Sequence, residues 1–215
     1  ILCAKQFATI DMISEGRFTL GVGVGGREED YKSIGSDWSN RRWATLSKNV
    51  KTMQSVWSKE LHPNLGPTTF SNGGPKILAG AVGPKAMEMS ANFAEGLAGF
   101  SFNADIEEIK DSFYRVNEAF KKNNKTPRLV TSFWFGLGES ARSDIQIHLE
   151  RYLSWMGDDL ANDLAKTAGF SGNQADLKEF LSLIKAAGAT DVLLVPTSKN
   201  IEQLILAEEV IAQFS

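Results

Sequence analysis

The sequence predicts an α/β fold in which parallel strands alternate with helices. Short apolar segments recur along the chain, and amphipathic segments of helical periodicity separate them. Because each intervening segment is long enough for a crossover helix, successive strands are expected to pair in parallel. Apolar strands without alternation, such as residues 192–195, fit a sheet that is buried on both faces.

The elements follow from these patterns in chain order. A helix around Cys3 to Ile13 ends before Gly16, where glycine and a charged residue stop the periodicity. Later helices are expected at residues 43–57, 84–93, 106–120, 141–155, 177–187 and 201–214. About five strands are expected, at residues 18–26, 76–82, 96–102, 129–135 and 191–195. Polar or irregular connections are predicted at residues 27–40, 58–74 and 157–176, the last with room for a short helix.

The net charge, the cysteine count and the lengths of the apolar runs limit the classes of function that the chain could have. A formal net charge of −3 gives no electrostatic basis for binding nucleic acid or an anionic membrane. One cysteine, Cys3, forms no intramolecular disulfide, which fits a reducing compartment. No apolar run reaches the ~20 residues of a spanning helix, and no secretory leader is present. A cytoplasmic protein is therefore expected.

The start of the chain bears on whether the sheet is open or closed. The chain begins at Ile1, in what looks like the middle of a helix, and this implies a strand upstream. A closed eight-stranded barrel needs ~250 residues, so five βα units leave about three unaccounted for. We therefore expect residues 1–215 to form a single domain, a truncated or partial (β/α) barrel that lacks N-terminal units.

Glycines are concentrated at the carboxyl end of the first predicted strand. Gly21, Gly23 and Gly26 match the spacing G-x-G-x-x-G of dinucleotide-binding proteins. In that fold the third glycine opens a helix, whereas here a charged loop is predicted after Gly26. The glycines could instead permit tight strand packing. Their concentration at the carboxyl end of a strand favours close approach of a ligand.

Four short motifs follow one another in the N-terminal quarter: LCAKQFATID at residues 2–11, SEGRF at residues 14–18, LGVGVG at residues 20–25 and REEDY at residues 27–31. In this order they resemble the bacterial-luciferase-like monooxygenase superfamily. The spacing from Gly35 to Arg42, before a helix that ends near Trp57, resembles the family as well. The pattern is strong over residues 1–60, and the later alternation is consistent with it.

The resemblance implies a TIM barrel that binds FMN or a deazaflavin coenzyme of the F-420 type at the carboxyl ends of its strands. It places three residues beside the cofactor, an arginine on its phosphate and a phosphate loop after the next strand: Val24, Gly25 and Glu29; Arg42; Gly80, Ala81, Val82 and Gly83. It also implies a flavin-dependent oxidoreductase or monooxygenase acting on a small organic substrate, and a homodimer. The family's first three βα units carry much of the catalytic machinery, so no catalytic residue is assigned.

The phosphate loop also has a physical basis. Pro84 suits the first position of a helix, and amides at a helix N-terminus attract anions. Luciferases have an acidic and a hydroxyl residue where this chain has Gly80 and Ala81, so a phosphate would depend on backbone amides and Lys85. An ordinary strand-to-helix turn is the alternative. For the whole chain, the alternative is a non-catalytic or truncated flavin-binding barrel that self-associates.

Other residue types give weaker indications. His62 and His148 are far from Cys3 and form no recognisable metal set, so no metal site is expected. No nucleophile elbow or triad pattern is present. Trp134 and Phe135 are expected in the core. Phe100, Phe102 and the charged segment at residues 27–30 have both a structural and a site interpretation, and for each the structural one is preferred.

Overall fold

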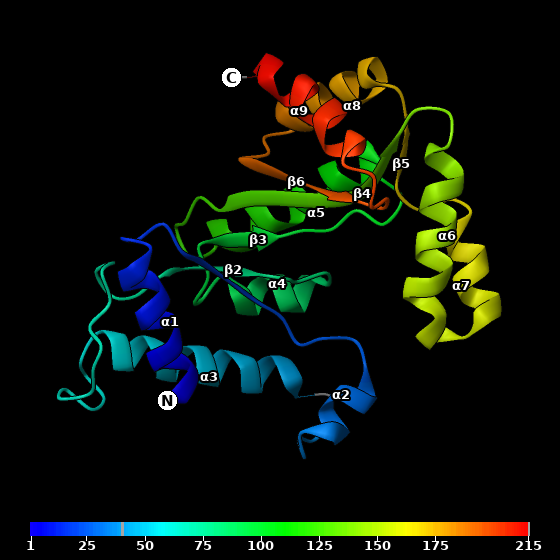
Figure 1. The fold of residues 1–215 in the computed structure, drawn as a ribbon. Coiled ribbons are helices and arrows are strands. Elements are labelled where there is room, and N and C mark those ends of the chain that lie inside the picture. Colours follow the sequence, from blue (N-terminus) through cyan, green and yellow to red (C-terminus); the bar gives the residue numbers. More distant parts are fainter. Residues whose placement is uncertain (40, 215) are drawn as a thin grey trace. The chain divides into compact units, whose positions relative to one another are not determined.

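The computed structural model describes residues 1–39 and 41–214. The chain divides into two compact units, and each is described by itself. The first comprises Ile1–Ala98 and Arg115–Arg128, and the second comprises Gly99–Tyr114 and Leu129–Ser215. Both are built from parallel strands and helices (Figure 1), so the predicted α/β class is confirmed.

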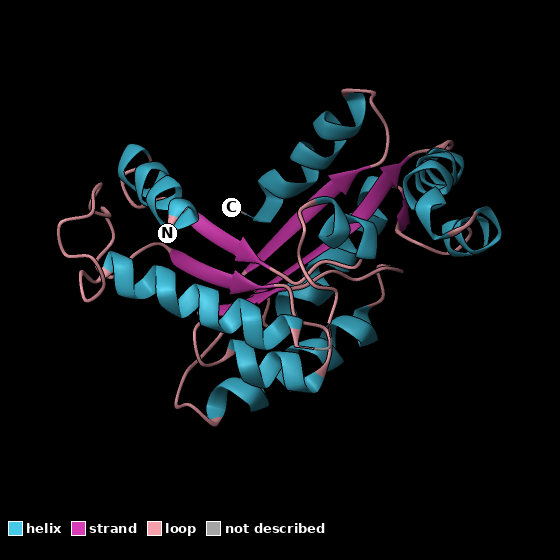
Figure 2. Ribbon diagram, turned by 90° about the horizontal axis from the view of Figure 1, so that it is seen from below, coloured by secondary structure: helices cyan, strands magenta, loops and turns pink. Residues whose placement is uncertain are grey.

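The first unit is a parallel three-stranded arrangement with helices packed around it (Figure 2). The strands pair in the order β1 (Thr19–Val22), β2 (Lys76–Ala79) and β3 (Gly96–Ala98). Val22 lies opposite Ala79, and Ala79 lies opposite Leu97. The carboxyl ends of β1 and β2 therefore lie level with each other. Its elements are α1 (Leu2–Ile13), β1 (Thr19–Val22), α2 (Glu28–Ser33), α3 (Arg42–Trp57), β2 (Lys76–Ala79), α4 (Pro84–Ser90), β3 (Gly96–Ala98) and the second half of α5 (Ile106–Lys121).

The second unit is centred on the ten-residue strand β4 (Arg128–Leu137). Two shorter strands pair with it in parallel. In β5 (Phe170–Gly172), Phe170 lies opposite Phe135, and in β6 (Asp191–Pro196), Asp191 lies opposite Val130. The other elements are the first half of α5, α6 (Ala141–Leu153), η1 (Ser154–Met156), α7 (Asp158–Ala165), β5 (Phe170–Gly172), α8 (Gln174–Ala186), β6 (Asp191–Pro196), α9 (Glu202–Ile211) and η2 (Ala212–Phe214).

Three predicted segments differ from the structure. The connection expected at residues 27–40 contains α2. The first turn of α2 holds Glu28, Glu29 and Asp30, whose carboxylates interact favourably with the positive end of the helix dipole. The segment at residues 157–176 contains α7, where the sequence left room for a short helix, and also β5, which was not predicted and makes six strands rather than about five. The first strand ends at Val22, so the following glycines lie in a loop.

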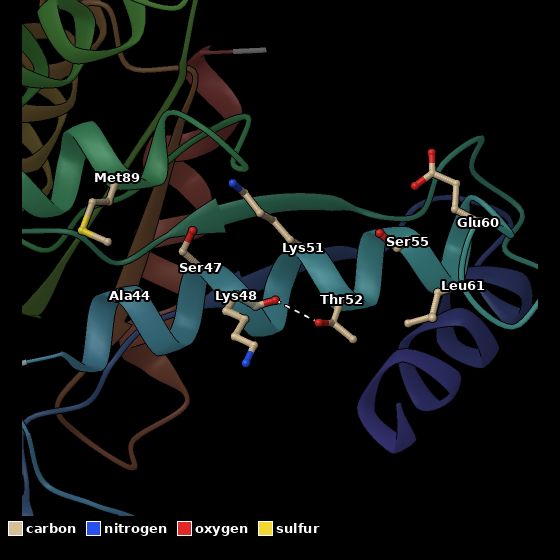
Figure 3. A pocket seen from close by; sticks show the side chains of 9 residues that line it. All are labelled: Ala44, Ser47, Lys48, Lys51, Thr52, Ser55, Glu60, Leu61 and Met89. Atoms are coloured by element: carbon tan, nitrogen blue, oxygen red, sulfur yellow. Dashed lines mark hydrogen bonds between the residues drawn. The ribbon is translucent and has the colours of Figure 1, made fainter.

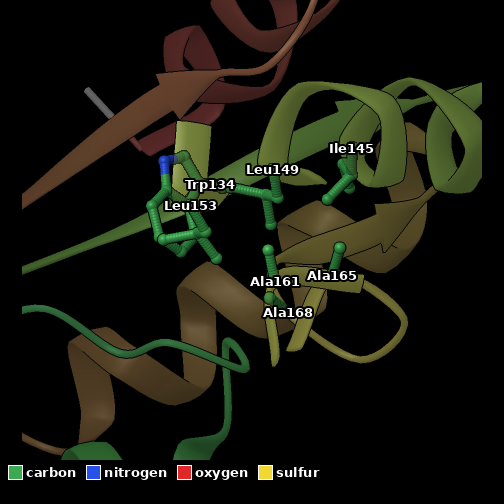
Figure 4. Close-up of a cluster of buried hydrophobic side chains, with 7 residues drawn as sticks. All are labelled: Trp134, Ile145, Leu149, Leu153, Ala161, Ala165 and Ala168. Carbon is green, nitrogen blue, oxygen red and sulfur yellow. The ribbon is translucent and has the colours of Figure 1, made fainter. Parts of the chain in front are cut away.

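A hydrophobic cluster in the second unit surrounds Trp134 of β4 (Figure 4). Ile145, Leu149 and Leu153 recur every four residues on α6 and meet small alanines of α7, so the two helices pack closely. Trp134 and Phe135 are both buried, as the sequence predicts. One face of α6 is thereby fixed against the sheet.

Asp11 holds the long connection before β2 against α1. Its carboxylate is fully buried and accepts hydrogen bonds from the backbone N–H and the hydroxyl of Ser71, both at 2.8 Å. We expect Asp11→Ala to lower the free energy of unfolding by about 2–3 kcal/mol, since it leaves the Ser71 donors unpaired. Thr9→Ala, an exposed change on the same helix, is expected to change it by less than about 0.5 kcal/mol. Urea denaturation measures both, and equal values would contradict this role for Asp11.

No helix within residues 1–39 and 41–214 is long and apolar enough to cross a membrane.

Candidate functional site

Two glycine-containing loops leave the same edge of the first unit's sheet. Residues 23–26 follow β1, and residues 80–83 follow β2. The backbone N–H of Gly80 donates to the carbonyl of Val22 at 2.8 Å, which joins the starts of the two loops. The carboxyl ends of parallel strands are where α/β proteins place their ligands. This edge is therefore the candidate site.

An aromatic and cationic cluster adjoins the loop after β1. The Arg42 guanidinium lies 3.6 Å from the centroid of the Trp38 ring, and Arg42 Nε donates to the carbonyl of Ser39 at 3.1 Å. Tyr31 meets Trp38 edge to face, with 5.1 Å between ring centroids, and its hydroxyl donates to the carbonyl of Val24. The cluster thus connects Val24 to Arg42, two of the predicted site residues.

The contacts leave part of the Arg42 guanidinium available. Among residues 1–39 and 41–214, neither of its two terminal amino groups has a hydrogen-bond or ion-pair partner. Stacking on Trp38 and the Nε bond restrict the orientation of the planar group. Such an arginine is prepared to bind phosphate oxygens through two parallel hydrogen bonds.

The other predicted residues near β1 are placed differently. Gly25 has a left-handed φ of 67° and faces Tyr31, since a Cβ atom there would lie 4.0 Å from that ring. Glu29 lies in α2 and is exposed to solvent. Its neighbours form exposed ion pairs within the helix, Glu28 with Lys32 at 3.0 Å and Arg27 with Asp30 at 3.9 Å. The role of Glu29 beside a cofactor stays a prediction.

The loop after β2 has the predicted strand-to-helix form. Ala81 is buried, whereas Val82 is 88% exposed. Gly83 is the N-cap residue of the seven-residue helix α4 and has no Cβ-side neighbour within 4 Å, and Pro84 takes the first helical position. Gly80 also has room, because a Cβ atom there would lie 3.7 Å from the Val22 carbonyl oxygen. A phosphate at these amides stays a prediction.

The segment that follows the glycines differs from the prediction. The sequence predicted a long loop after Gly26, but α2 begins at Glu28 with Arg27 as its N-cap residue. The distance from the glycines to the next helix therefore does not exclude a dinucleotide-binding turn. The region about twenty residues further on does argue against it, because it lies in α3 rather than at the end of a second strand.

The sequence did not single out Trp38 or the hydroxyl of Tyr31. Both are aromatic residues shortly before Arg42, and this spacing is the signal that the chain offers. Their contacts depend on the conformation of the α2–α3 connection, which periodicity does not reveal.

A separate groove of about 680 Å³ runs along the exposed side of α3 (Figure 3). Lys48, Lys51 and Thr52 line it from α3, and Met89 from α4. It follows a helix face rather than the ends of the strands, so it is not part of the candidate site. In the part of the chain that the structure describes, no group of three or more His, Cys, Asp or Glu side chains is placed to hold a metal ion.

The model of the luciferase-like monooxygenase family matches residues 1–202. The chain belongs to this family. The FMNH(2)-dependent dimethylsulfone monooxygenase of Pseudomonas fluorescens (strain Pf0-1) is 22% identical over 225 residues, which cover 96% of this chain and 61% of that protein. The F420-dependent glucose-6-phosphate dehydrogenase of Amycolatopsis mediterranei (strain U-32) is 32% identical over 59 residues, 26% of this chain and 18% of that protein.

Solved structures agree on the fold. An F420-dependent secondary alcohol dehydrogenase, in complex with an F420-acetone adduct, superposes with a TM-score of 0.77 at 15% identity, covering 100% of this chain and 74% of that one. The oxygenating constituent of 3,6-diketocamphane monooxygenase from Pseudomonas putida, in complex with FMN, gives 0.67 at 13% identity, covering 99% and 74%. The predicted TIM-barrel type of fold is thereby confirmed.

Proposed function

We propose that this luciferase-like chain is part of a flavin-dependent oxidoreductase that acts with reduced FMN or a deazaflavin coenzyme on a small organic molecule. The observation that supports this most directly is Arg42, stacked on Trp38 beside the end of β1 with both terminal amino groups free of partners among the described residues. Family membership supports the reaction class.

The residues at this edge fit a phosphorylated cofactor. Arg42 would hold the phosphate, and the backbone amides of Val82 and Gly83 would add donors. The amides of Gly80 and Ala81 already donate to the carbonyls of Val22 and Ala79. Val24 and Gly25 would border the flavin ring, with Glu29 near by. When bound, a reduced flavin supplies hydride or activates dioxygen, and the protein binds it, orients it and excludes water.

Two classes of cofactor, FMN and the deazaflavin, are consistent with this proposal. One relative is named as FMNH(2)-dependent and another as F420-dependent, so both cofactor classes occur among similar proteins. The single-domain organisation, the cytoplasmic location and the homodimer remain predictions. Light scattering of the purified chain tests the dimer.

We expect Arg42→Ala to weaken the binding of the preferred cofactor by about tenfold or more, because it removes charge-assisted hydrogen bonds to the phosphate. Fluorescence titration with FMN and with the deazaflavin measures this and distinguishes the two cofactors. Arg41→Ala is the matched control, because Arg41 is adjacent, exposed and equally charged. It should leave the dissociation constant unchanged.

The competing proposal is a flavin-binding barrel that self-associates without catalysis. The chain spans 61% of the length of the dimethylsulfone monooxygenase it matches, so activity of this chain alone is itself a proposal. Cofactor binding followed by substrate-dependent oxidation of the reduced cofactor supports the enzyme. Saturable binding without turnover supports the competing proposal, and the absence of binding of either cofactor contradicts both.

A further inference from the structure

A second hollow lies within the second unit, at the carboxyl end of β6. It has a volume of about 560 Å³ and is open to solvent. One wall is a face of α6 with Asp144, Ile147, His148 and Arg151, and the other is the segment after β6, which ends at Lys199. None of these side chains belongs to the flavin site proposed above.

The packing of α6 fixes the first wall. Ile145, Leu149 and Leu153 are buried against Trp134 and α7, and the groove residues occupy a different face of the same helix. Positions 144, 147, 148 and 151 are neighbours on a helix surface because they are separated by three or four residues. The side chains of this wall are thus presented together by a buried helix face rather than by a loop.

Hydrogen bonds to β4 fix the second wall. Thr197 is buried, and both its backbone N–H and its hydroxyl donate to the carbonyl of Phe135, at 3.3 Å and 3.0 Å. Lys199 follows two residues later and also lines the groove. In barrels of this type, ligands bind at the carboxyl ends of the strands.

The charges of the groove are unbalanced. Among residues 1–39 and 41–214, Arg151 and Lys199 have no ion-pair partner, while the single carboxylate in the groove, Asp144, accepts a hydrogen bond from Ser140 at 2.9 Å. Burial, together with the charge of Arg151, lowers the pKa of His148 below its ordinary value. The His148 ring stacks on Tyr152. At neutral pH two cations therefore face one carboxylate.

An apolar surface adjoins this positive region. Ile147 lies between Asp144 and Arg151 on the α6 wall, and 67% of it is exposed. A bare inorganic ion would leave this side chain in water, whereas the chain of an organic ligand would cover it.

We propose that this groove binds a small organic anion, a carboxylate, sulfonate or phosphate carried on a short apolar chain. Arg151 and Lys199 hold the anionic group, and Ile147 contacts the chain. Arginine suits this role because its planar fork matches an anion with two or three oxygens. Binding in this groove requires no flavin, so the proposal can be tested independently of the proposed cofactor site.

The two histidines of the chain provide the test, since His148 lies in the groove and His62 in the other unit. Their ring C–H signals are assigned with His148→Gln and followed by NMR during titration with hexanesulfonate and hexanoate at constant ionic strength. We expect a saturable shift of the His148 signal and a stationary His62 signal. Arg151→Gln and Lys199→Gln should each raise the dissociation constant about tenfold.

Lys178→Gln, an exposed change on α8, is the matched charge control and should leave the dissociation constant unchanged. Equal movement of both histidine signals, no saturation, or unchanged affinity in Arg151→Gln and Lys199→Gln would overturn the proposal. Sodium sulfate is the comparator, and sulfate binding as tight as that of hexanesulfonate would overturn the contact with an apolar chain. The wild-type titration is decisive even if a variant fails to fold.

Discussion

Replacing Gly96 by alanine is expected to lower the free energy of unfolding by about 3 kcal/mol or more, one of the largest effects of a single methyl group in this chain. Gly96 begins β3 and pairs with Leu78 of β2. A Cβ atom at Gly96 would lie 1.9 Å from the carbonyl oxygen of Arg128 and 2.7 Å from its carbonyl carbon and its amide nitrogen. Since these are backbone atoms, no rotamer change relieves the overlap, and β3 must shift.

Gly21→Ala is the matched control, because Gly21 also lies in a strand of the first unit and a Cβ atom there has no neighbour within 4 Å. It should be neutral or slightly stabilising, since alanine reduces the freedom of the unfolded chain. Urea denaturation followed by circular dichroism measures both variants. A Gly96→Ala protein as stable as Gly21→Ala would show that β3 and Arg128 are not in close contact.

The regular elements could be predicted where the periodicity is long. The helix α5 repeats buried residues such as Ile109, Phe113, Val116 and Phe120 at helical spacing, and most residues of β4 are apolar and buried. The missed elements, α2 and β5, have six and three residues, too few for any period to emerge. The bond between Asp11 and Ser71, sixty positions apart, is equally invisible to local patterns.

The sequence likewise predicted some residues of the candidate sites and missed others. The family motifs predicted Arg42 and residues 80–83, and the structure places Arg42 beside the loop after β1. Trp38 and the hydroxyl of Tyr31 could not be predicted, because their contacts depend on how one irregular connection folds. The groove of Arg151 and Lys199 requires a helix face and a loop 48 positions apart to meet. The helix that forms one wall and the strand that precedes the other could each be predicted from the sequence, but the proximity of the two walls could not.

The second large effect is expected at Trp57, the last residue of α3. Trp57 is 5% exposed, and its indole N–H donates to the carbonyl of Ala4 in α1 at 2.9 Å. We expect Trp57→Ala to lower the free energy of unfolding by about 3–5 kcal/mol, through lost burial and the cavity that remains. Trp57→Phe keeps most of the ring but loses the hydrogen bond, and about 1–2 kcal/mol is expected for it. Urea denaturation measures both.

A double-mutant cycle with Gly74 tests whether Trp57 packs as described. Gly74 has φ at 107°, and a Cβ atom there would lie 2.2 Å from Cε3 of Trp57. Gly74→Ala alone should therefore be destabilising both through backbone strain and through the overlap with the indole. In the background of Trp57→Ala the overlap is gone and only the strain remains. The double variant should be more stable than additivity predicts, by about 1–3 kcal/mol. Additive effects would mean that the Trp57 ring does not cover Gly74, and the anchoring of the connection before β2 would have to depend on Asp11 instead.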